Sequence, residues 1–511
     1  GSIAAEGDLS RAIHSRNYGQ TPSVVTLNGT TVSGQDRAIY SYYSTLTLNG
    51  AAVSAVNNAA VHGEGSDITI DGGLISSEKG PGIVFLGGIV LEEAADLLAA
   101  DNTASFKTLE LDGGVTVTGD TFAVSGNGSA KEDEPYSGTI INVRDASLTG
   151  KTAHGVYQPQ VGILNVYEGA EISGASGIEI RAGELYVSGG TITGTSSELV
   201  ISDAAAGGGG GTSINGAAIA ISQHSTNKPI FVSITGGNLT GPAALYEEDV
   251  LNETANDTIN AAVSGGTFTS TQEGMASVFS ENMKGFVSGG IFGEALPAEY
   301  LAEDCAQIAS GETFTVGTEK NLAAAQNAVA VVEETGIAYT NLQEAINNAS
   351  DGDTIKLLQS ITVDTAAANH PEGRTDVGLY ILQKNLTING NGKTIQSSSV
   401  PRILNVIGDY NADGTADCDM FTVTIENLTI VSTGDSHRPL ETRGGNITLN
   451  LENVMLDNTG TTVANSIAFS VGGNSTCGSS ALPVNVNISG STLTAMATGY
   501  AFKSFNPVTL N

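Results

Sequence analysis

The chain has 511 residues, and its 54 acidic and 20 basic residues give it a formal net charge of −34. This balance argues against nucleic acid or an anionic membrane surface as a partner, because both are bound through basic patches, and no apolar run of about 20 residues predicts a transmembrane helix. The 65 glycines, the lack of tryptophan and a charged fraction of 14%, against about 25% in ordinary domains, indicate many tight turns and a narrow aliphatic core.

From residue 25 onwards, a short alternating strand followed by a tight turn recurs many times. The segments "VTLNGTTVSG" (25–34), "LELDGGVTVTG" (109–119) and "ELYVSGGTITG" (184–194) show the pattern. The apolar residues just before the turns mark the register: Leu27, Leu48, Ile70, Leu111, Val143, Val166, Val187, Ile234, Val263 and Val287. Several of these markers are 21 to 24 positions apart, and the longer intervals leave room for a degenerate repeat or an inserted loop. Repetition with this period predicts a solenoid.

Glycine pairs such as Gly189 and Gly190 identify the corners of this solenoid. Glycine weakens a strand interior because it has no side chain to pack. Glycine, asparagine and aspartate nevertheless tolerate the positive φ that a tight corner requires. A repeat of about 22 residues fits three short strands with corners between them. The sequence therefore predicts an all-β parallel β-helix, a β-solenoid whose coils stack about 4.8 Å apart.

The first run of repeats stops after the segment "FVSGGIFGEALPAEYLAEDCAQI" (286–308). Pro297 is suited to the first position of a helical turn, and such a turn would close the first solenoid. We expect this first β-helix to occupy residues 1–316 and a linker to follow over residues 317–331.

A second β-helix is expected over residues 332–511. Thr340 and Gln343 have the spacing of a capping box, and an amphipathic helix over 341–349 would cover the core and strand edges of the first coil. The final segment "VTLN" (508–511) has the pattern of another first strand, so we interpret the second β-helix as truncated at its C-terminus. The opening "GS" resembles a cloning remnant, and the chain is interpreted as a fragment of a longer protein.

Three segments carry a resemblance to known proteins. "NLQEAINNASDGDTIKLL" (341–358) resembles the amino-terminal cap of right-handed β-helices in the pectate-lyase-like superfamily, and "LTINGNGKTI" (386–395) resembles its strand–asparagine–strand corner. Together with "VSGGIFGEALPAEYLAED" (287–304), they are similar to large adhesin-like surface proteins of anaerobic Gram-positive gut bacteria. The resemblance implies two tandem right-handed parallel β-helices with short capping helices, in a secreted or cell-surface protein.

The resemblance leaves the activity open, because the superfamily includes lyases, hydrolases, adhesins and passive stalks. The first hypothesis is a monomeric surface adhesin that binds glycans or components of host or bacterial surfaces. The second is a polysaccharide lyase or glycoside hydrolase, and the third is a passive stalk. No nucleophile elbow, zinc pattern or phosphate loop is present. The paired carboxylates that enzymes of this superfamily carry on stacked strands are also missing, so we expect no catalysis in this chain.

Aromatic side chains are the usual platforms for sugars, and tryptophan is absent. The segment "YSYYS" (40–44) offers Tyr40, Tyr42 and Tyr43 as candidate ligand-binding residues. The alternative is that at least one of the three has a packing role.

Ionisable residues are densest in "NHPEGRTD" (369–376) and "GDSHRPLETRGG" (434–445). If "LETRG" is a strand, Glu441 and Arg443 point outward on the same face, with Asp435 and His437 in the preceding loop. A carboxylate beside an arginine and a histidine is able to act in acid–base catalysis. The alternative is a solvated loop with a surface ion pair.

The segment "GDYNADGTADCDM" (408–420) resembles the calcium loops of EF-hands and dockerin-type modules. Calcium requires six to eight oxygen ligands folded around it, and Met420 stands where those families carry a bidentate acid. The candidate ligands are Asp409, Asn411, Asp413, Thr415, Asp417 and Asp419. The alternative is an acidic loop without a cation.

The three cysteines leave two alternatives open. Cys418 and Cys477 occupy the same corner two coils apart by strand counting, a separation of about 9.6 Å that only flexible loops would bridge. Either they form a disulfide, as suits an exported protein, and Cys305 stays alone, or all three are free thiols.

Overall fold

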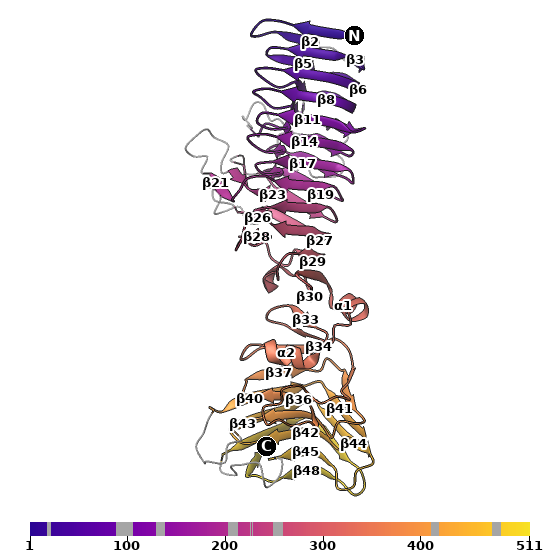
Figure 1. The fold of residues 1–511 in the computed structure, drawn as a ribbon, viewed down its shortest axis with the longest axis vertical. Helices are drawn as coiled ribbons and strands as arrows, with labels where there is room; N and C mark the ends of the chain where they lie inside the picture. The colour runs from indigo at the N-terminus through magenta and orange to yellow at the C-terminus, as the bar shows by residue number, and fades with distance from the viewer. Residues whose placement is uncertain are drawn as a thin grey trace. The chain divides into compact units, whose positions relative to one another are not determined.

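The structure is a computed structural model, and it describes residues 1–17, 22–87, 106–128, 138–202, 213–224, 226, 228–248, 259–409, 418–472 and 482–511. These residues form parallel β-strands with two short α-helices (Figure 1), which confirms the prediction of an all-β chain. The chain divides into two compact units. Unit 1 comprises residues 1–303 and 310–316, and unit 2 comprises residues 304–309 and 317–511.

Unit 1 is built from strands that recur along three lines. The first line contains β3 (Ser23–Asn28), β10 (Lys107–Asp112), β13 (Thr139–Val143), β16 (Gly162–Val166), β19 (Gly183–Val187) and β24 (Ile230–Ile234). The second line contains β1 (Ser2–Ala5), β4 (Thr31–Gly34), β11 (Val115–Gly119), β14 (Ala146–Gly150), β17 (Ala170–Gly174), β20 (Thr191–Gly194) and β25 (Asn238–Gly241). Four further strands pair with these: β6 (Ser44–Ala55), β8 (Asp67–Ser77), β27 (Ile259–Ser270) and β29 (Val287–Phe292).

The third line of unit 1 is a parallel ten-stranded sheet. Its strands are β2 (Arg11–Arg16), β5 (Arg37–Tyr42), β7 (Val61–Glu64), β9 (Ile83–Leu86), β12 (Val124–Ser125), β15 (Val156–Gln158), β18 (Ile178–Ile180), β23 (Ala217–Ile221), β26 (Ala243–Glu247) and β28 (Val278–Ser280). Two short strands, β21 (Val200–Ser202) and β22 (Ser213–Asn215), form an antiparallel pair of their own.

The predicted register markers form one unbroken column. Each of the ten residues from Leu27 to Val287 is the direct cross-strand partner of the next marker. Because side chains alternate along a strand, this register keeps every second residue in the interior. Burying one such aliphatic side chain contributes about 1.5–3 kcal/mol, so the column is a major source of stability in unit 1.

Corner glycines allow the repeats to approach one another. Gly190, Gly237 and Gly266 have φ values of +83°, +95° and +99° at successive corners between the first and second lines, as the sequence predicted. The preceding glycine at each corner is constrained by space. A Cβ atom added to Gly265 would lie 2.3 Å from the carbonyl oxygen of Thr235 in the previous repeat, closer than real Cβ contacts come.

A single 3-10 turn, η5 (Ala298–Tyr300), lies near the end of unit 1. Pro297 is the residue before this turn rather than its first helical residue. Tyr300 is buried, and its ring lies 5.2 Å from that of Phe286. Phe314 to Val316 of β31 (Thr313–Thr318) pair antiparallel with β29.

Unit 2 begins with folded segments where we expected a linker. Residues 317–331 include α1 (Glu319–Gln326), and β32 (Ala330–Val332) follows directly. Thr318 caps α1 by accepting a hydrogen bond from the Asn321 amide. Small apolar residues are frequent in this segment, and it lacks the glycine pairs that mark a corner of the repeats. A helix needs neither feature; it needs only an N-cap and residues with good helix propensity.

The helix at the start of the second set of repeats is α2 (Leu342–Asn348), but its predicted cap is wrong. Asn341, not Thr340, is the N-cap residue, and its side chain accepts hydrogen bonds from the amides of Gln343 and Glu344. Asparagine satisfies the same unpaired amides as threonine at this position. Leu342, Ala345 and Ile346 are buried in the core of unit 2, as the helical spacing predicted.

The repeats of unit 2 also follow three lines of parallel strands. The first contains β34 (Thr354–Leu357), β37 (Leu386–Asn389), β40 (Phe421–Glu426), β43 (Ile447–Glu452), β46 (Val484–Ser489) and β49 (Val508–Leu510). The second contains β35 (Ile361–Thr362), β38 (Thr394–Ser397), β41 (Thr429–Gly434), β44 (Met455–Thr461) and β47 (Thr492–Ala495). The third contains β36 (Val377–Leu382), β39 (Arg402–Ile407), β42 (Arg438–Arg443), β45 (Ile467–Val471) and β48 (Tyr500–Ser504). Two other strands, β30 (Cys305–Ser310) and β33 (Ile337–Tyr339), pair in parallel before the repeats.

Replacing Gly265 by alanine tests the close stacking of the corners. The new Cβ would meet a backbone oxygen that cannot move aside, so we expect the free energy of unfolding of unit 1 to fall by about 2 kcal/mol or more. Gly293→Ala is the matched control, because its Cβ would lie 3.9 Å from the nearest atom, the carbonyl oxygen of Phe268. Urea unfolding followed by circular dichroism measures both variants, and equal stabilities would contradict the stacking.

Candidate functional site

A cluster of charged side chains in unit 2 lies on the outer face of the third line of strands. Leu440 of β42 belongs to the core, so the alternation along the strand places Glu441 on the opposite face, together with Arg443. Both side chains were expected to point outward, and both are buried, with Glu441 0% and Arg443 2% exposed. The side chains of neighbouring charged residues cover Glu441 and Arg443.

Three arginines surround the Glu441 carboxylate. Arg438 Nη1 donates a hydrogen bond to Glu441 Oε1 at 2.6 Å. Arg402 Nε lies 2.9 Å from Oε2, close enough for an ion pair but outside hydrogen-bond alignment, and Arg443 Nη1 lies 3.9 Å from the same oxygen. A fully buried carboxylate is stable only when positive charges and donors compensate its lost hydration, and these arginines supply both.

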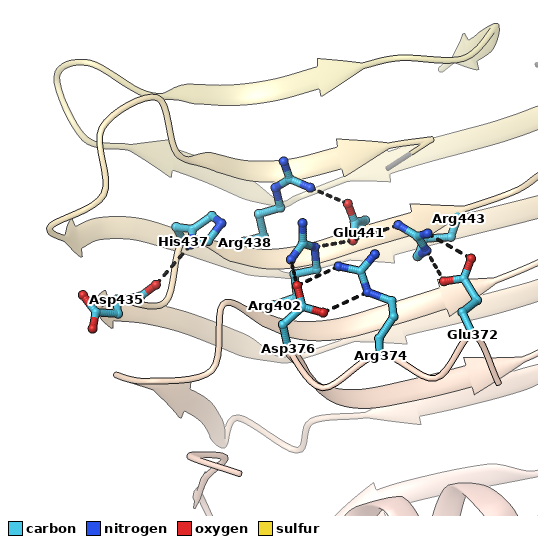
Figure 2. A network of polar contacts seen from close by, with 9 residues as sticks. All are labelled: Glu372, Arg374, Asp376, Arg402, Asp435, His437, Arg438, Glu441 and Arg443. Atoms are coloured by element: carbon cyan, nitrogen blue, oxygen red, sulfur yellow. Dashed lines mark hydrogen bonds and ion pairs between the residues drawn. The ribbon is translucent and has the colours of Figure 1, made fainter. Parts of the chain in front are cut away.

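A loop from another part of the chain completes the cluster (Figure 2). Glu372 accepts two hydrogen bonds from Arg443, at 2.5 Å from Nε and 2.9 Å from Nη2. Asp376 accepts two from Arg374, at 2.9 Å and 2.8 Å, and a further one from Arg402 Nη1. We call these side chains the arginine–carboxylate network: Glu372, Arg374, Asp376, Arg402, Arg438, Glu441 and Arg443.

The network favours the ionised form of Asp376. Burial alone would raise the pKa of Asp376, but the hydrogen bond from Arg374 and the charges of Arg402 and Arg374 outweigh it and lower the pKa. Burial of the Arg402 side chain lowers its pKa, and the negative charge of Glu441 opposes this shift. Because bidentate arginine–carboxylate pairs are rigid as well as strong, the network fixes the loop against the sheet.

Asp435 and His437 do not join this network (Figure 2). The Nδ1 atom of His437 lies 3.1 Å from the backbone oxygen of Asp435, and the Asp435 side chain is exposed. Burial, together with the charges of Arg402 and Arg438, lowers the pKa of His437, which favours its neutral form. Of the four candidate catalytic residues, the structure therefore brings only Glu441 and Arg443 together.

The sequence analysis did not predict that five of the seven network members contact one another or the two candidate residues Glu441 and Arg443. It identified the two charged segments, 369–376 and 434–445, but treated them separately. Their proximity depends on the register of β36, β39 and β42, which places Arg402 opposite Arg438 and both beside the loop. Matching these strands by their apolar residues would have revealed that pairing.

Tyr40 and Tyr42 lie on the outer face of the third line of strands in unit 1, and Tyr43 directly follows their strand, β5. In register, Tyr40 is between His14 and His62, and Tyr42 is between Arg16 and Glu64. The ring of Tyr40 lies 5.0 Å from His14 and 4.8 Å from His62. We call Tyr40, Tyr42, Tyr43, His14 and His62 the tyrosine patch.

Each tyrosine of the patch has a different environment. Tyr43 is 38% exposed and contacts Tyr42 edge to face at 4.6 Å. Its ring also packs over Gly65, where a Cβ would approach it within 2.8 Å. Tyr40 is half-buried and donates a hydrogen bond to Glu64, and burial and this carboxylate raise its pKa to about 12. The patch therefore combines packing with a partly exposed aromatic surface.

Two arginines border the tyrosine patch. The guanidinium carbon of Arg11 lies 4.6 Å from the centre of the Tyr40 ring, and that of Arg16 lies 5.1 Å from the Tyr42 ring. Both arginines are exposed. Such cation–π contacts hold the rings in place and add donors beside them.

A buried contact between a histidine and a carboxylate further along the same sheet was not predicted. His154 Nε2 lies 2.9 Å from Glu179 Oε2, and Glu179 is 0% exposed. Glu179 also accepts hydrogen bonds from Ser213 Oγ and the Ile214 amide, at 3.1 Å and 2.9 Å. Burial acts to raise the pKa of Glu179, but His154 and the hydrogen bonds lower it. These contacts anchor the β21–β22 pair to β18.

The calcium and disulfide predictions fall largely outside the described residues. Asn411, Asp413, Thr415, Asp417 and Cys477 all lie there. Of the remaining candidates, Asp409 is buried, Asp419 is exposed, and the Cys418 carbonyl accepts a hydrogen bond from Asn446. Within the described ranges, no three histidine, cysteine, aspartate or glutamate side chains are placed to hold a metal ion. Both sites stay predictions.

Comparisons with known proteins found no protein-family model that matches the chain and no curated protein that matches it at a significant level. Among the described residues, no helix has the length and apolar character needed to cross a membrane.

Neutralising Glu441 tests whether the network is a structural unit. Glu441→Gln would leave three arginines facing an uncharged amide, and we expect the free energy of unfolding of unit 2 to fall by about 3 kcal/mol. Asp435→Asn removes the same charge from an exposed side chain and should change stability by less than about 0.5 kcal/mol. Chemical denaturation measures both, and a smaller loss for Glu441→Gln than for Asp435→Asn would overturn this description.

Proposed function

We propose that both units are right-handed parallel β-helices and that the chain is part of an extracellular bacterial surface protein that binds glycans. The resemblance of the cap and corner segments supports the handedness and the surface location. The in-register parallel pairing in both units supports the β-helix. A strongly acidic surface suits a soluble protein that does not bind polyanions.

The tyrosine patch is the observation that carries the binding function. Saccharides present apolar C–H faces and hydroxyl groups, and they are recognised by aromatic rings with polar groups beside them. The patch offers Tyr42 and the 38% exposed Tyr43 next to Arg16, Glu64 and the Tyr40 hydroxyl. Because Tyr40 and Tyr42 lie on one strand, β5, of a sheet and Tyr43 directly follows that strand, the spacing of Tyr40 and Tyr42 is fixed, as a preformed binding surface requires.

The enzyme hypothesis has less support from the geometry. Catalysis of glycosidic bond cleavage requires ionisable groups that reach the substrate. Glu441 is 0% exposed and enclosed by arginines, and the Asp435 side chain is exposed on a separate loop. A passive stalk would account for the repeats but not for a partly exposed aromatic cluster flanked by arginines.

The binding function is tested by removing the Tyr42 ring. We expect the wild-type chain to bind a subset of glycans on an array, and Tyr42→Ala to weaken that binding about five- to tenfold, since the loss of one stacking ring costs about 1–1.5 kcal/mol. Tyr186→Ala is the control, because Tyr186 is 37% exposed but lies on a first-line strand, β19, away from the patch. Wild-type binding that survives Tyr42→Ala, or no binding at all, would contradict the proposal.

A further inference from the structure

Three arginines lie at the tyrosine patch, although the chain has few basic residues. Of its 20 lysines and arginines, Arg11 and Arg16 lie on β2 and Arg37 lies on β5, the strands that also carry His14 and Tyr42. Arg11 and Arg37 are direct partners across these strands. Like charges placed opposite each other weaken the pairing of strands, so the stability of the sheet does not by itself favour this arrangement.

Two of these arginines share one carboxylate. Asp36 Oδ2 lies 2.7 Å from Arg37 Nη1 and 3.7 Å from Arg11 Nε. The carboxylate of Glu64 accepts the hydrogen bond from the Tyr40 hydroxyl. Among the described side chains in these contacts and over the tyrosine rings, three guanidinium groups lie near two carboxylates. The patch therefore carries an excess of positive charge in a protein whose net charge is −34.

The arginine charges act on the same surface as the aromatic rings. Partial burial lowers the pKa of His14, and the charges of Arg11 and Arg16 lower it further. Burial lowers the pKa of His62 to about 3, and the charges of Arg37 and Arg11 act in the same direction. Both histidines are therefore neutral at neutral pH, where they add hydrogen-bonding groups to the patch without adding charge.

A row of three side chains crosses the patch from a positive end to a negative end. Arg16, Tyr42 and Glu64 are direct partners on β2, β5 and β7. The Arg16 guanidinium lies over the Tyr42 ring, and a guanidinium in this position keeps its N–H donors in its own plane. Arg16 and Glu64 are two strand spacings apart, about 9.6 Å. An anionic group is therefore able to contact Arg16 without approaching Glu64.

We propose that the tyrosine patch selects saccharides that carry a single negative charge, and that Arg16 is the residue that sets this specificity. The inference rests on the proposed glycan-binding function. A carboxylate or a sulfate accepts the N–H donors of Arg16, while an uncharged part of the saccharide lies over Tyr42 and Tyr43. Glu64 repels a second negative charge at the other end of the row. The net charge of −34 repels polyanions.

Matched sets of glycans test this preference with the full chain. Each set contains a neutral oligosaccharide, the same molecule with one primary hydroxyl oxidised to a carboxylate, and the same molecule with one hydroxyl sulfated. Polygalacturonate serves as the polyanion. Affinities are measured on an array and then by calorimetry at physiological ionic strength. We expect at least one singly charged member to bind about tenfold more tightly than its neutral parent, the gain from one charge-assisted hydrogen bond. Comparison of the two charged members identifies the anion.

Arg16→Gln is the decisive variant, because it removes the charge from an exposed side chain. We expect it to abolish the preference for the charged member over its neutral parent, whereas Tyr42→Ala weakens both members together. Arg144→Gln is the matched control. The Arg144 guanidinium also lies over a tyrosine, 4.1 Å from the centre of the Tyr167 ring, so this variant removes the same charge and the same kind of contact elsewhere in unit 1. It should keep the preference.

Glu64→Gln tests the restriction to one charge. The glutamine keeps an acceptor for the Tyr40 hydroxyl but no longer repels an anion. We expect this variant to bind an oligosaccharide with two carboxylates that the wild-type chain rejects. Equal binding of that ligand by the two proteins overturns the restriction.

The inference and the proposed function fail in different ways. A wild-type chain that binds the neutral parent as tightly as the charged members, or polygalacturonate most tightly, overturns the inference and leaves glycan binding in place. A preference that survives Arg16→Gln, or that is lost equally in Arg144→Gln, does the same. A wild-type chain that binds no member of any set overturns the proposed function, and the inference with it.

Discussion

The fold depends on one constraint, the constant register between successive repeats. Parallel strands alternate their side chains between two faces, and a slip of one residue would turn every interior side chain outward. The markers from Leu27 to Val287 stay paired, although Ile70 and Leu111 are 41 positions apart and Val187 and Ile234 are 47 apart, and the register shifts between β27 and β29 begin only after Val263. The strands that follow these long intervals therefore pair in the same register as before. Residues on the outer faces keep fixed spacing, which the tyrosine patch requires as a proposed binding surface.

Much of this fold could be predicted from the sequence because the constraint is periodic. Positive φ at Gly190 and the pairing of the markers follow from short-range patterns that recur. Predictions that depended on a single position were weaker. Thr340 and Asn341 are both good caps, and nothing local distinguishes them until the chain direction into α2 is known. The helix α1 was missed because its small residues resemble a linker as much as a helix.

The sites were less predictable because they combine residues from different repeats. The sequence predicted that Glu441 and Arg443 lie on one face, because side chains two positions apart on a strand point to the same side. It could not reveal their burial, which depends on Glu372 and Asp376 some 65 to 71 positions earlier. The buried pair of His154 and Glu179 depends in the same way on two neighbouring strands and on Ser213. Charges that look like a solvated surface in sequence become a network only once the register is known.

The register is tested most directly by disulfide formation between engineered cysteines on strands that are distant in sequence. Tyr186 and Ser233 are direct partners on β19 and β24, 47 residues apart, and both lie on the outer face. With the three native cysteines replaced by serine, Tyr186→Cys with Ser233→Cys should oxidise readily, because paired residues meet the distance a disulfide requires. Tyr186→Cys with Phe231→Cys is displaced by two residues along the strand and should stay reduced under the same conditions. Equal oxidation of the two pairs, or faster oxidation of the displaced pair, would contradict the in-register stack.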